Sequence, residues 1–535
     1  MQGAKEAGML ESPMWFMRRA AIGAICAWLA MGAAGCARQP AGEPGTLNFL
    51  IESQPTNLDP RIGTDAQSED LDGLMFDGLV QRDTQMNVVP DLAESWETPD
   101  ALTYVFHLRR GVKFHDGRPL TSADVKFTLD SIISGAVETP KRGAFQHVRS
   151  VEAPDDATVI IRLSEPYASF IYNLTRLAIG IVPGGSGAEM SRRPVGTGPF
   201  RFVSMTPDEE ILLERNPDYF GQAPSIERVR FRIVPDAIVR ALELRKGTAD
   251  VGGMNSLTPD MVVALAKQPG IQVEEQPGTA LAYVAFNFDD PILAHREVRQ
   301  ALAYATDRTA LVQYLLRGQA RLASGLLPPN NWAYEPDVKE YGFDPARAEQ
   351  LLDAAGFPRG AHGVRFHLEL KTSTEESARL LGEVLADEWK RIGVTLELRP
   401  LENATLLADI TRGSFQLYTF RWVGYTNNDP DIFDYVFSSR RMPPLGANRG
   451  HYHNPALDAL LDQQRVEMNR EKRKEILSEI QKMVAKDEPY INLWYLDNVC
   501  VHRDTVTGIV ISPGGDYDFL ERAALRETSG SAEQH

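Results

Sequence analysis

The sequence predicts an α/β protein built from more than one lobe. Short stretches in which every second residue is apolar alternate with longer stretches in which apolar residues recur every three or four positions. In the second half, helical stretches end at glycine and strand-like stretches follow at once, an order typical of α/β folds. A chain of 535 residues also exceeds what one hydrophobic core usually holds, so two or three domains are expected.

The first half of the chain is predicted to contain two strands with a helix between them. Residues 102–108 and 228–234 each alternate apolar and polar side chains, as a strand with one buried face does. Thr121 and Asp124 have the spacing of a capping box, in which each side chain bonds the other residue's backbone. We therefore expect a helix to begin directly after Thr121.

The second half contains the clearest helix signals. Asp344 followed by Pro345 is a typical helix start, and Gly356 ends the apolar pattern that follows. A longer amphipathic stretch ends at Gly393, and an alternating strand follows it directly. Asn454 precedes a further apolar repeat and is expected to cap a helix.

Charge and composition exclude several classes of function. The formal net charge is −17, while the 43% of hydrophobic and 24% of charged residues are ordinary for a globular protein. An acidic surface repels nucleic acid and anionic lipid, so binding to polyanions is not expected. The three cysteines, Cys26, Cys36 and Cys500, share no metal-binding spacing and do not predict a zinc site.

The N-terminus has the pattern of an export signal. Two arginines precede an apolar run, residues 20–35, that is too short to span a bilayer and ends in small residues, so residues 1–35 are expected to be a signal peptide. The run ends in Ala-Ala-Gly before Cys36, which resembles a bacterial lipobox. Cys36 is therefore the expected site of lipid attachment, and a plain signal peptide cut nearby is the alternative. Residues 36–45, with their prolines and glycines, would form a tether.

Four stretches, taken in their order and spacing, carry a resemblance to one protein family. They are residues 102–129 (LTYVFHLRRGVKFHDGRPLTSADVKFTL), 193–202 (RPVGTGPFRF), 214–251 (ERNPDYFGQAPSIERVRFRIVPDAIVRALELRKGTADV) and 284–308 (VAFNFDDPILAHREVRQALAYATDR). The chain resembles the extracytoplasmic solute-binding proteins of the peptide/nickel/opine class, family 5. This family includes oligopeptide- and dipeptide-binding proteins and serves ABC importers. The resemblance extends over residues 46–525.

The resemblance implies a two-lobed periplasmic-binding-protein fold of class II, in which two strands form the hinge and one lobe carries an inserted domain. Carried onto this sequence, lobe I comprises residues 46–82, 200–284 and 498–530, the inserted domain 83–199, and lobe II 285–497. The solute is expected to lie buried between the lobes. Contacts formed only on hinge closure would then stabilise the closed state.

The segment from Arg421 to Asp431, RWVGYTNNDPD, is the main candidate for binding a ligand. Its glycine, asparagines and proline predict a loop, and a loop seldom carries tryptophan and tyrosine without a surface to cover. In peptide-binding members of the family this loop reads roughly Trp-x-Gly-Asp, and the aspartate holds the peptide's ammonium group by a charge-assisted bond. Here Tyr425 replaces that aspartate and one residue is inserted before Asp429, which weakens the prediction of ordinary peptide binding.

Each residue of this loop also has a structural interpretation. Trp422 fits either the core or a pocket wall, and Tyr425 fits either a pocket or a contact between lobes. Asp429 fits an amine-binding role, whereas Asp429 and Asp431 together fit capping of the helix that follows. A calcium loop starting at Asp429 fails on the spacing of its later ligands. A catalytic carboxylate pair is possible in principle, but no motif places a nucleophile or a second acid beside it.

Further candidates for binding a ligand come from three other stretches. Asn448 and Arg449 offer an amide and a bidentate fork for a carboxylate or for hydroxyl groups, with a solvated loop as the alternative. Gln54 follows the first strand, and Asn287 fits ligand binding and pinning of the hinge backbone equally well. The full set of candidates is Gln54, Tyr283, Asn287, Arg421, Trp422, Tyr425, Asn428, Asp429, Asn448 and Arg449.

Two remaining patterns, a histidine pair and a glycine pair, are not interpreted as binding sites. His451 and His453 form a His-x-His pair, but no third ligand lies nearby in the sequence, so they make a poor nickel site. Gly196 and Gly198 lack the strand–GxGxxG–helix context of a phosphate-binding loop. These two glycines are expected to serve a backbone turn.

These observations favour a binding protein over an enzyme. We expect an exported monomer of the periplasm or cell envelope that captures an oligopeptide or related solute and delivers it to ABC permease subunits. No cofactor, metal, catalytic residue or nucleic-acid partner is expected. The alternatives are an enzyme or sensor that reuses the fold, and an uptake protein for a nickel chelate or an oligosaccharide.

Overall fold

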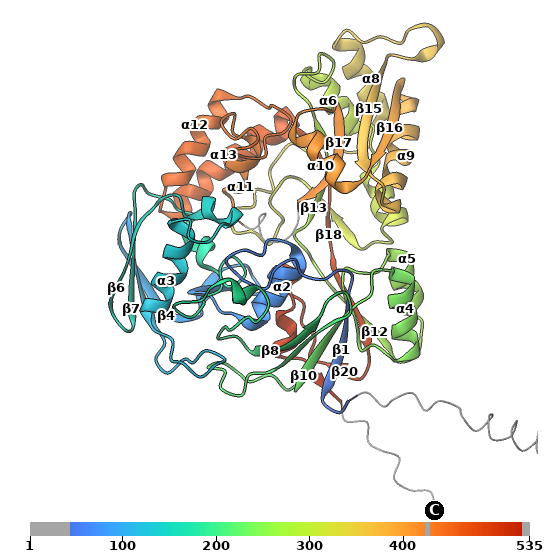
Figure 1. Ribbon diagram of the computed structural model, residues 1–535. Helices are drawn as coiled ribbons and strands as arrows, with labels where there is room; N and C mark the ends of the chain where they lie inside the picture. The colour runs from blue at the N-terminus through green and yellow to red at the C-terminus, as the bar shows by residue number, and fades with distance from the viewer. Residues whose placement is uncertain (1–42, 423–428, 527–535) are drawn as a thin grey trace, which may run out of the picture. The chain divides into compact units, whose positions relative to one another are not determined.

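The computed structural model describes residues 43–422 and 429–526 (Figure 1). The chain divides into two compact units, Met1–Thr46 and Leu47–His535, and the description below concerns the second unit. The predicted signal peptide 1–35, lipid attachment at Cys36 and most of the tether 36–45 lie outside the described residues. Of the helices in the described ranges, none is both long enough and apolar enough to cross a membrane.

A seven-stranded sheet is assembled from three separated parts of the chain. Its strand order is β12-β19-β11-β1-β10-β9-β8. β1 runs parallel to β11, with Phe49 opposite Val251, whereas the pairs β8–β9, β9–β10 and β12–β19 are antiparallel. The strands are β1 (Thr46–Ile51), β8 (Phe200–Thr206), β9 (Glu210–Arg215), β10 (Arg228–Ile233), β11 (Val251–Met254), β12 (Ile271–Gln276) and β19 (Asn498–Arg503).

A six-stranded sheet, of order β14-β18-β13-β17-β15-β16, is buried on both faces. Alternate residues of its strand β13 belong to two separate hydrophobic clusters: Val284 and Phe286 to one, Tyr283 and Ala285 to the other. Burial on both faces explains why this strand is a continuous apolar run in the sequence. The strands are β13 (Leu281–Phe286), β14 (Ala320–Leu322), β15 (Phe366–Ser373), β16 (Val394–Leu401), β17 (Leu417–Trp422) and β18 (Tyr490–Leu496).

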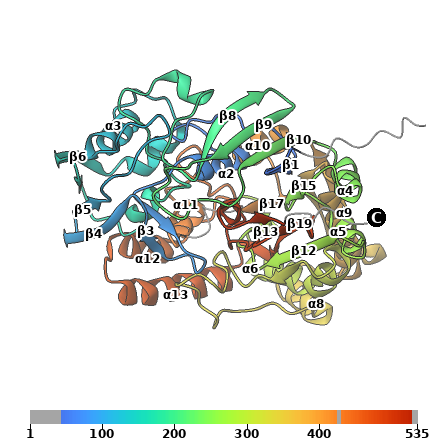
Figure 2. The same cartoon turned by 90° about the horizontal axis from the view of Figure 1, so that it is seen from below.

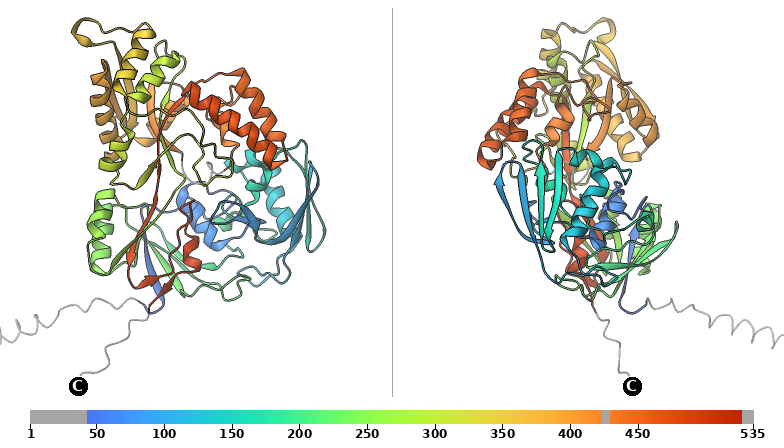
Figure 3. Two further views of the ribbon diagram at one scale, coloured as in Figure 1. Left: turned by 180° about the vertical axis from the view of Figure 1, so that it is seen from behind. Right: turned by 60° about the vertical axis from the view of Figure 1, so that its left-hand side comes forward.

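Helices cover both faces of this second sheet. Residues of α6, α8 and α9 pack in the cluster on one face, and residues of α10 to α13 pack in the cluster on the other (Figures 1 and 3). The helices are α6 (Arg296–Tyr304), α7 (Arg308–Ala310), α8 (Pro345–Ala354), α9 (Glu376–Arg391), α10 (Asn403–Thr411), α11 (Ile432–Phe437), α12 (Pro455–Val466) and α13 (Arg470–Asp487). The fold class is therefore α/β, as predicted.

A third, four-stranded antiparallel sheet has the order β4-β5-β7-β6. Helix α3 (Ser122–Ile133) packs against β6 and β7 (Figure 2). On β5, Tyr104, Phe106 and Leu108 are buried as their alternation predicts, while Leu102 precedes the strand and is 38% exposed. The strands are β4 (Ala93–Asp100), β5 (Thr103–Leu108), β6 (Val148–Asp155) and β7 (Thr158–Leu163).

The remaining elements are short. Two hairpins pair β2 (Val80–Arg82) with β3 (Val88–Pro90) and β20 (Val506–Thr507) with β21 (Ala524–Leu525). Helix α2 (Ala66–Met75) packs in the core of the seven-stranded sheet, and α4 (Ala237–Lys246) and α5 (Pro259–Leu265) pack in a separate cluster with β12 and β19.

The predicted helix starts are confirmed. Thr121 is the N-cap of α3 and forms a capping box with Asp124. The side chain of Asp344 accepts a hydrogen bond from the backbone of Arg347 at the start of α8. Asn454 caps α12 in the same way through Ala456 N. Each of these contacts spans at most three residues, which is why the local sequence predicts them.

Gly196 and Gly198 permit a close backbone approach to the end of α2. A Cβ atom added to Gly196 would lie 2.1 Å from the carbonyl oxygen of Met75, and one added to Gly198 would lie 2.5 Å from the Met75 carbonyl carbon. Gly198 N also donates to Met75 O at 3.0 Å. The glycines therefore serve the backbone, in agreement with the prediction.

Two connections join the large sheets. One runs through residues 277–280, between β12 and β13, and the other is Asp497, between β18 and β19. The predicted lobe boundary at residue 284 falls inside β13, whose residues all pair within the six-stranded sheet. The two short connections are the part of the fold where a hinge of the predicted kind would lie.

Candidate functional site

Five side chains on one face of the six-stranded sheet form what we call the aromatic–arginine cluster: Tyr283, Tyr418, Trp422, Tyr490 and Arg449. Three hydrogen-bonded strands supply the aromatic residues, since β13 lies between β17 and β18. Tyr418 and Trp422 are four residues apart on β17, so the strand period places them on the same face. Arg449 reaches the cluster from the loop that precedes α12.

The rings of the cluster stack closely. Tyr283 lies 4.3 Å from Tyr490 between ring centroids, with 12° between the planes, and Trp422 stacks at 6.1 Å on Tyr283. Tyr418 meets Tyr283 edge-on at 5.9 Å. The guanidinium carbon of Arg449 lies 5.5 Å from the Trp422 ring, within the range of a cation–π contact. The cluster therefore presents a cation held against aromatic faces.

Several polar atoms of the cluster are buried and poorly satisfied. Within residues 43–422 and 429–526, Arg449 Nη1 and the hydroxyls of Tyr283 and Tyr418 make no hydrogen bond of good geometry. Against the effect of burial, the nearby phenols, Tyr418 first, raise the pKa of Arg449. Burial, and then the neighbouring Tyr418, raises the pKa of Tyr283 and of Tyr490, so these phenols stay protonated at neutral pH. A group rich in acceptor atoms, or an anion, is the complement of this arrangement.

Asp429 and Asp431 form a second polar group, which contacts the segment that follows the four-stranded sheet. Asp429 Oδ1 accepts a hydrogen bond from Ser169 Oγ at 2.7 Å. Asp431 Oδ2 accepts from the Tyr167 hydroxyl at 3.1 Å, and its Oδ1 accepts from Gln464 Nε2 at 2.8 Å. Burial, and then the nearby Asp429, raises the pKa of Asp431.

These contacts decide between the interpretations of the two aspartates. Asp431 occupies the N-cap position of α11, but its side chain makes no capping hydrogen bond, so capping by this carboxylate is wrong. Its two oxygens are already committed to Tyr167 and Gln464. Asp429 Oδ1 also accepts from Asp431 N at 2.8 Å, so it helps to shape the turn into α11. Both aspartates thus hold segments of the protein together.

Asn287 and Asn448 use their side chains to pin backbone. Asn287 Nδ2 donates to Phe415 O at 2.8 Å and its Oδ1 accepts from Asp289 N at 3.0 Å. Asn448 Nδ2 donates to Tyr452 O at 2.7 Å and to Ser438 O at 3.1 Å, and its Oδ1 accepts from Tyr452 N at 2.9 Å. The pinning interpretation of Asn287 fits these contacts, and Asn448 holds the loop from which Arg449 projects.

The other predicted residues lie apart from the cluster. Gln54 accepts a hydrogen bond from Asp208 N at 3.0 Å. Arg421 is exposed, and its guanidinium is 4.0 Å from the carboxylate of Glu375. Tyr425 and Asn428 lie outside the described residues. Of the ten predicted residues, the structure brings together Tyr283, Trp422 and Arg449.

Sequence reasoning missed several residues of both groups. Tyr418 and Tyr490 were not among the candidates, and the only signal for Tyr418 was that it stands four residues before Trp422, a spacing that places both on one face of a strand. Tyr167, Ser169 and Arg473 carried no signal, because their partners lie more than 250 residues away or in another element.

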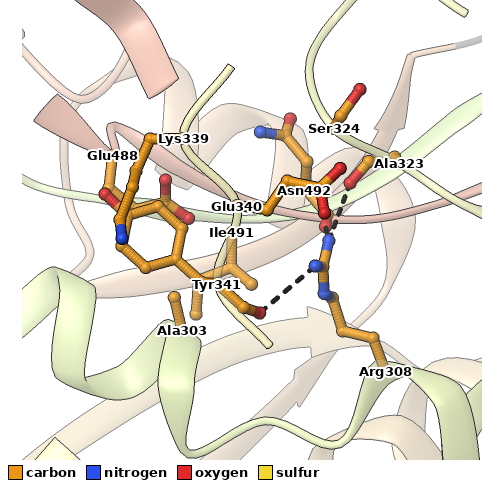
Figure 4. A pocket seen from close by; sticks show the side chains of 10 residues that line it. All are labelled: Ala303, Arg308, Ala323, Ser324, Lys339, Glu340, Tyr341, Glu488, Ile491 and Asn492. Carbon is orange, nitrogen blue, oxygen red and sulfur yellow. Dashed lines mark hydrogen bonds between the residues drawn. The ribbon is translucent and has the colours of Figure 1, made fainter. Parts of the chain in front are cut away.

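A separate small, open hollow lies near Arg308 and Glu488 (Figure 4). The Arg308 guanidinium donates to the backbone oxygens of Ala323 and Asn492, both at 2.7 Å. Burial raises the pKa of Glu488 well above its ordinary value, against the effect of Arg308 and Arg299. Because the donors of Arg308 already brace the backbone, this hollow is a weaker candidate than the cluster.

No metal site is formed by side chains in the described part of the chain. No group of three or more histidine, cysteine, aspartate or glutamate residues that could hold an ion is found there. His451 Nδ1 instead contacts the carboxylate of Asp289. Cys500 is a buried thiol in β19.

Comparison with known proteins places the chain among binding proteins. The profile described as "Bacterial extracellular solute-binding proteins, family 5 Middle" matches residues 87–444. The dipeptide-binding protein of Escherichia coli (strain K12) is 28% identical over 503 residues, which cover 89% of this chain and 94% of that protein. Heme-binding protein A of Haemophilus influenzae is 31% identical over 468 residues, covering 81% and 83% of the two chains.

A solved structure shares the fold over nearly the same length. NikZ from Campylobacter jejuni, in complex with Ni(L-His), superimposes with a TM-score of 0.78 at 26% identity. The match covers 90% of this chain and 100% of that one. The three named relatives bind different solutes according to their names, so the family alone does not fix the solute of a given member.

Proposed function

This chain belongs to the bacterial extracellular solute-binding proteins of family 5, and we propose that its own solute is an oligopeptide or a closely related compound. As a member of this family it has the two-lobed α/β fold of periplasmic binding proteins. It captures a solute outside the cytoplasm and delivers it to the permease of an ABC transporter. The family is one of binding proteins, not of enzymes.

The aromatic–arginine cluster is the observation that carries the proposal for the solute. A peptide offers backbone carbonyl oxygens and at least one carboxylate, which are the acceptors that Arg449, Tyr283 and Tyr418 lack. The stacked rings provide apolar walls of the kind that binding pockets use around a few polar groups. The name of the dipeptide-binding relative supports the same class of solute.

The way in which the solute is held departs from the family pattern. The expected ammonium-binding aspartate is replaced by Tyr425, and Asp429 Oδ1 already accepts two hydrogen bonds from the protein. We therefore propose that the principal polar grip is at the cluster, through Arg449 and the phenols, and that the amino end of the solute contributes less than in other peptide binders.

A comparison of solute classes tests the proposal. Peptides of two to five residues, a nickel–histidine chelate, heme and neutral oligosaccharides are added separately, and the midpoint of thermal unfolding is recorded. A ligand that binds only the native state stabilises that state and so raises this midpoint. At a free ligand concentration of 100 times the dissociation constant, the stabilisation is about 2.7 kcal/mol. Peptides are expected to raise it. A rise with the chelate, heme or an oligosaccharide alone would replace the peptide assignment.

Export and anchoring are proposed from the N-terminal sequence. We propose that residues 1–35 are removed as a signal peptide, that lipidated Cys36 anchors the mature chain to the membrane, and that the chain acts as a monomer. In cells, Cys36→Ser should release the protein into the soluble envelope fraction, and a label carried by fatty acid should be lost with it. Unchanged labelling would exclude Cys36 as the attachment site.

We also propose the lobe assignment implied by the family. Lobe I comprises the segments around the seven-stranded sheet, lobe II the segment around the six-stranded sheet, and the inserted domain the segment around the four-stranded sheet. The first lobe crossing is proposed at 277–280 instead of 284, since β13 pairs wholly within the second sheet.

A further inference from the structure

Three consecutive residues, 167–169, join the proposed inserted domain to lobe II. The hydroxyl of Tyr167 donates to Asp431 Oδ2 at 3.1 Å, and Ala168 N donates to Arg465 O at 2.9 Å. Burial, and then Asp431, raises the pKa of Tyr167 well above its ordinary value, so the hydroxyl keeps the proton that it donates. Figures 1 and 3 show α12 and α13 of lobe II beside the inserted domain, away from β18, whose end leads into the proposed hinge.

Ser169 is the middle link of a chain whose two ends belong to lobe II. Arg473 Nη2 donates to Ser169 Oγ at 2.6 Å, and Ser169 Oγ donates to Asp429 Oδ1 at 2.7 Å. The guanidinium of Arg473 also lies 3.6 Å from the Asp429 carboxylate. The exposed fractions of Arg473 and Ser169 are 4% and 2%. Hydrogen bonds to a charged group are stronger than neutral ones, so a hydroxyl of the inserted domain completes a buried charged contact of lobe II.

The inserted domain is in turn held firmly against lobe I. The guanidinium of Arg176, in the inserted domain, lies 2.7 Å from the carboxylate of Glu521 and 3.2 Å from that of Asp518, and the arginine side chain is 4% exposed. Gly198 N donates to Met75 O at 3.0 Å, at the end of α2. We therefore expect the inserted domain to move with lobe I, because separating the two would break the pairs of a buried cation.

Near the hinge, lobe I contacts lobe II through an exposed ion pair. The guanidinium of Arg317, which precedes β14, lies 2.7 Å from the carboxylate of Asp260 in α5, and the two side chains are 42% and 73% exposed. Exposed pairs of this kind contribute little to stability. The displacement of a contact also grows with its distance from the axis of rotation. Opening of the lobes therefore separates residues 167–169 from lobe II more than it separates this pair.

We propose that residues 167–169 form a latch that holds the lobes closed, which gives the inserted domain a role in retaining the solute. The inference rests on the proposed function and adds to it. Rotation about the hinge would carry the inserted domain away from lobe II and return Arg473, Asp429 and Asp431 to water. The apparent affinity for a solute falls when less of the protein is in the binding-competent closed state. The latch therefore tightens the binding of every solute without touching any.

Two other roles for these residues lead to different results. If the inserted domain and lobe II never separate, removal of the two hydroxyls lowers the free energy of unfolding and leaves the affinity for solutes unchanged. If the residues contact the solute directly, the affinity falls for some solutes and not for others. A latch lowers the affinity for all solutes by one factor, because closure is common to them.

The test removes the two hydroxyls from the full chain. Tyr167→Phe, Ser169→Ala and the double variant each delete oxygen atoms only, and Ser164→Ala, at an exposed serine of the same segment, is the matched control. Titration calorimetry gives the dissociation constants of alanine peptides of two to five residues. Small-angle X-ray scattering gives the radius of gyration without added peptide, and urea unfolding shows that each variant is folded.

The double variant should bind every peptide at least about tenfold more weakly than the wild type and the control, because the closed state loses two hydrogen bonds. Each single variant should show a smaller loss that is also equal among the peptides. Unchanged dissociation constants in a folded double variant overturn the latch and leave peptide capture intact. Losses that differ among peptides also overturn it, because they place the two side chains at the solute.

The scattering measurement separates this inference from the proposed function. If no peptide binds the wild type, the peptide assignment is wrong, and the radius of gyration decides the fate of the latch. A larger radius in the double variant than in the wild type and the control supports the latch. Equal radii in all three proteins overturn it.

Discussion

Ser169 Oγ donates a hydrogen bond to Asp429 Oδ1 at 2.7 Å, joining residues 260 positions apart. Arg473 completes the contact: its Nη2 donates to Ser169 Oγ at 2.6 Å and lies 3.6 Å from the Asp429 carboxylate. Ser169 and Arg473 are both buried. This network fastens the segment after the four-stranded sheet to Asp429, near the C-terminal end of the predicted ligand loop, so that end of the loop is held by residues from outside its own sheet.

Removal of the Ser169 hydroxyl should weaken this network moderately. Ser169→Ala should lower the free energy of unfolding by about 1 to 2 kcal/mol, because Arg473 and Asp429 each lose a hydrogen bond. Asp429→Asn should cost more, since it leaves the buried Arg473 without its nearby carboxylate. Urea unfolding measures both changes. Ser164→Ala, an exposed serine of the same segment, is the control, and equal losses for Ser169→Ala and Asp429→Asn would contradict the charge argument.

Glu388 should make stability depend on pH. Burial raises the pKa of Glu388 to about 7 from 4.5, with Asp307 and Asp387 adding to the shift and Asp307 N and Arg391 opposing it. A carboxyl whose pKa is raised in the folded state stabilises the fold below its unfolded pKa, and this contribution is lost as the pH rises from about 4.5 to 7. The stability of the wild type should therefore fall over that interval.

Glu388→Gln should remove this dependence. The amide oxygen still accepts from Asp307 N, a contact of 3.2 Å in the wild type, and carries no charge to desolvate. Unfolding by urea below, within and above the interval measures the slope for both proteins. The explanation is wrong if the variant retains the slope of the wild type.

Asn448 should control both stability and the position of Arg449. Asn448→Ala removes three hydrogen bonds from a residue that is 2% exposed, so a loss of about 2 to 3 kcal/mol is expected. The variant should also bind peptides more weakly, because the loop that carries Arg449 of the proposed site is released. Gln350→Ala, on the exposed side of α8, is the control. Unchanged peptide affinity in a destabilised Asn448→Ala protein would show that Asn448 supports the fold and not the position of Arg449.

Gly196 should tolerate no side chain. In Gly196→Ala the new Cβ would lie 2.1 Å from Met75 O. Because Met75 O is a backbone atom at the end of the packed helix α2, it cannot swing aside as a side chain could, and a large destabilisation is expected. Gly143→Ala is the matched control, since a Cβ there meets nothing within 4 Å. Thermal unfolding of the two variants tests this. Similar midpoints for Gly196→Ala and Gly143→Ala would show that the end of α2 can shift to make room for the new Cβ.

The site illustrates where prediction from sequence stops. Trp422 and Arg449 were predicted from loop composition and residue type, and both lie in the cluster. Tyr490 was not predicted as a site residue, because its contact with Tyr283 depends on which strands pair. Asp431 was predicted as a helix cap, but Tyr167 and Gln464 bind its carboxylate instead. These partners of Asp431 are far away in the sequence, so the local sequence could not predict them.

The sequence by itself determined the features that rest on local chemistry. Helix starts at Thr121, Asp344 and Asn454 depend on hydrogen bonds within one turn, and the α/β order and the family resemblance follow from patterns of neighbouring residues. The tertiary structure alone decided which polar groups are satisfied. It gives Asp429 its donors and, among residues 43–422 and 429–526, leaves Arg449 Nη1 without a hydrogen bond of good geometry, because satisfaction depends on residues that only folding brings together.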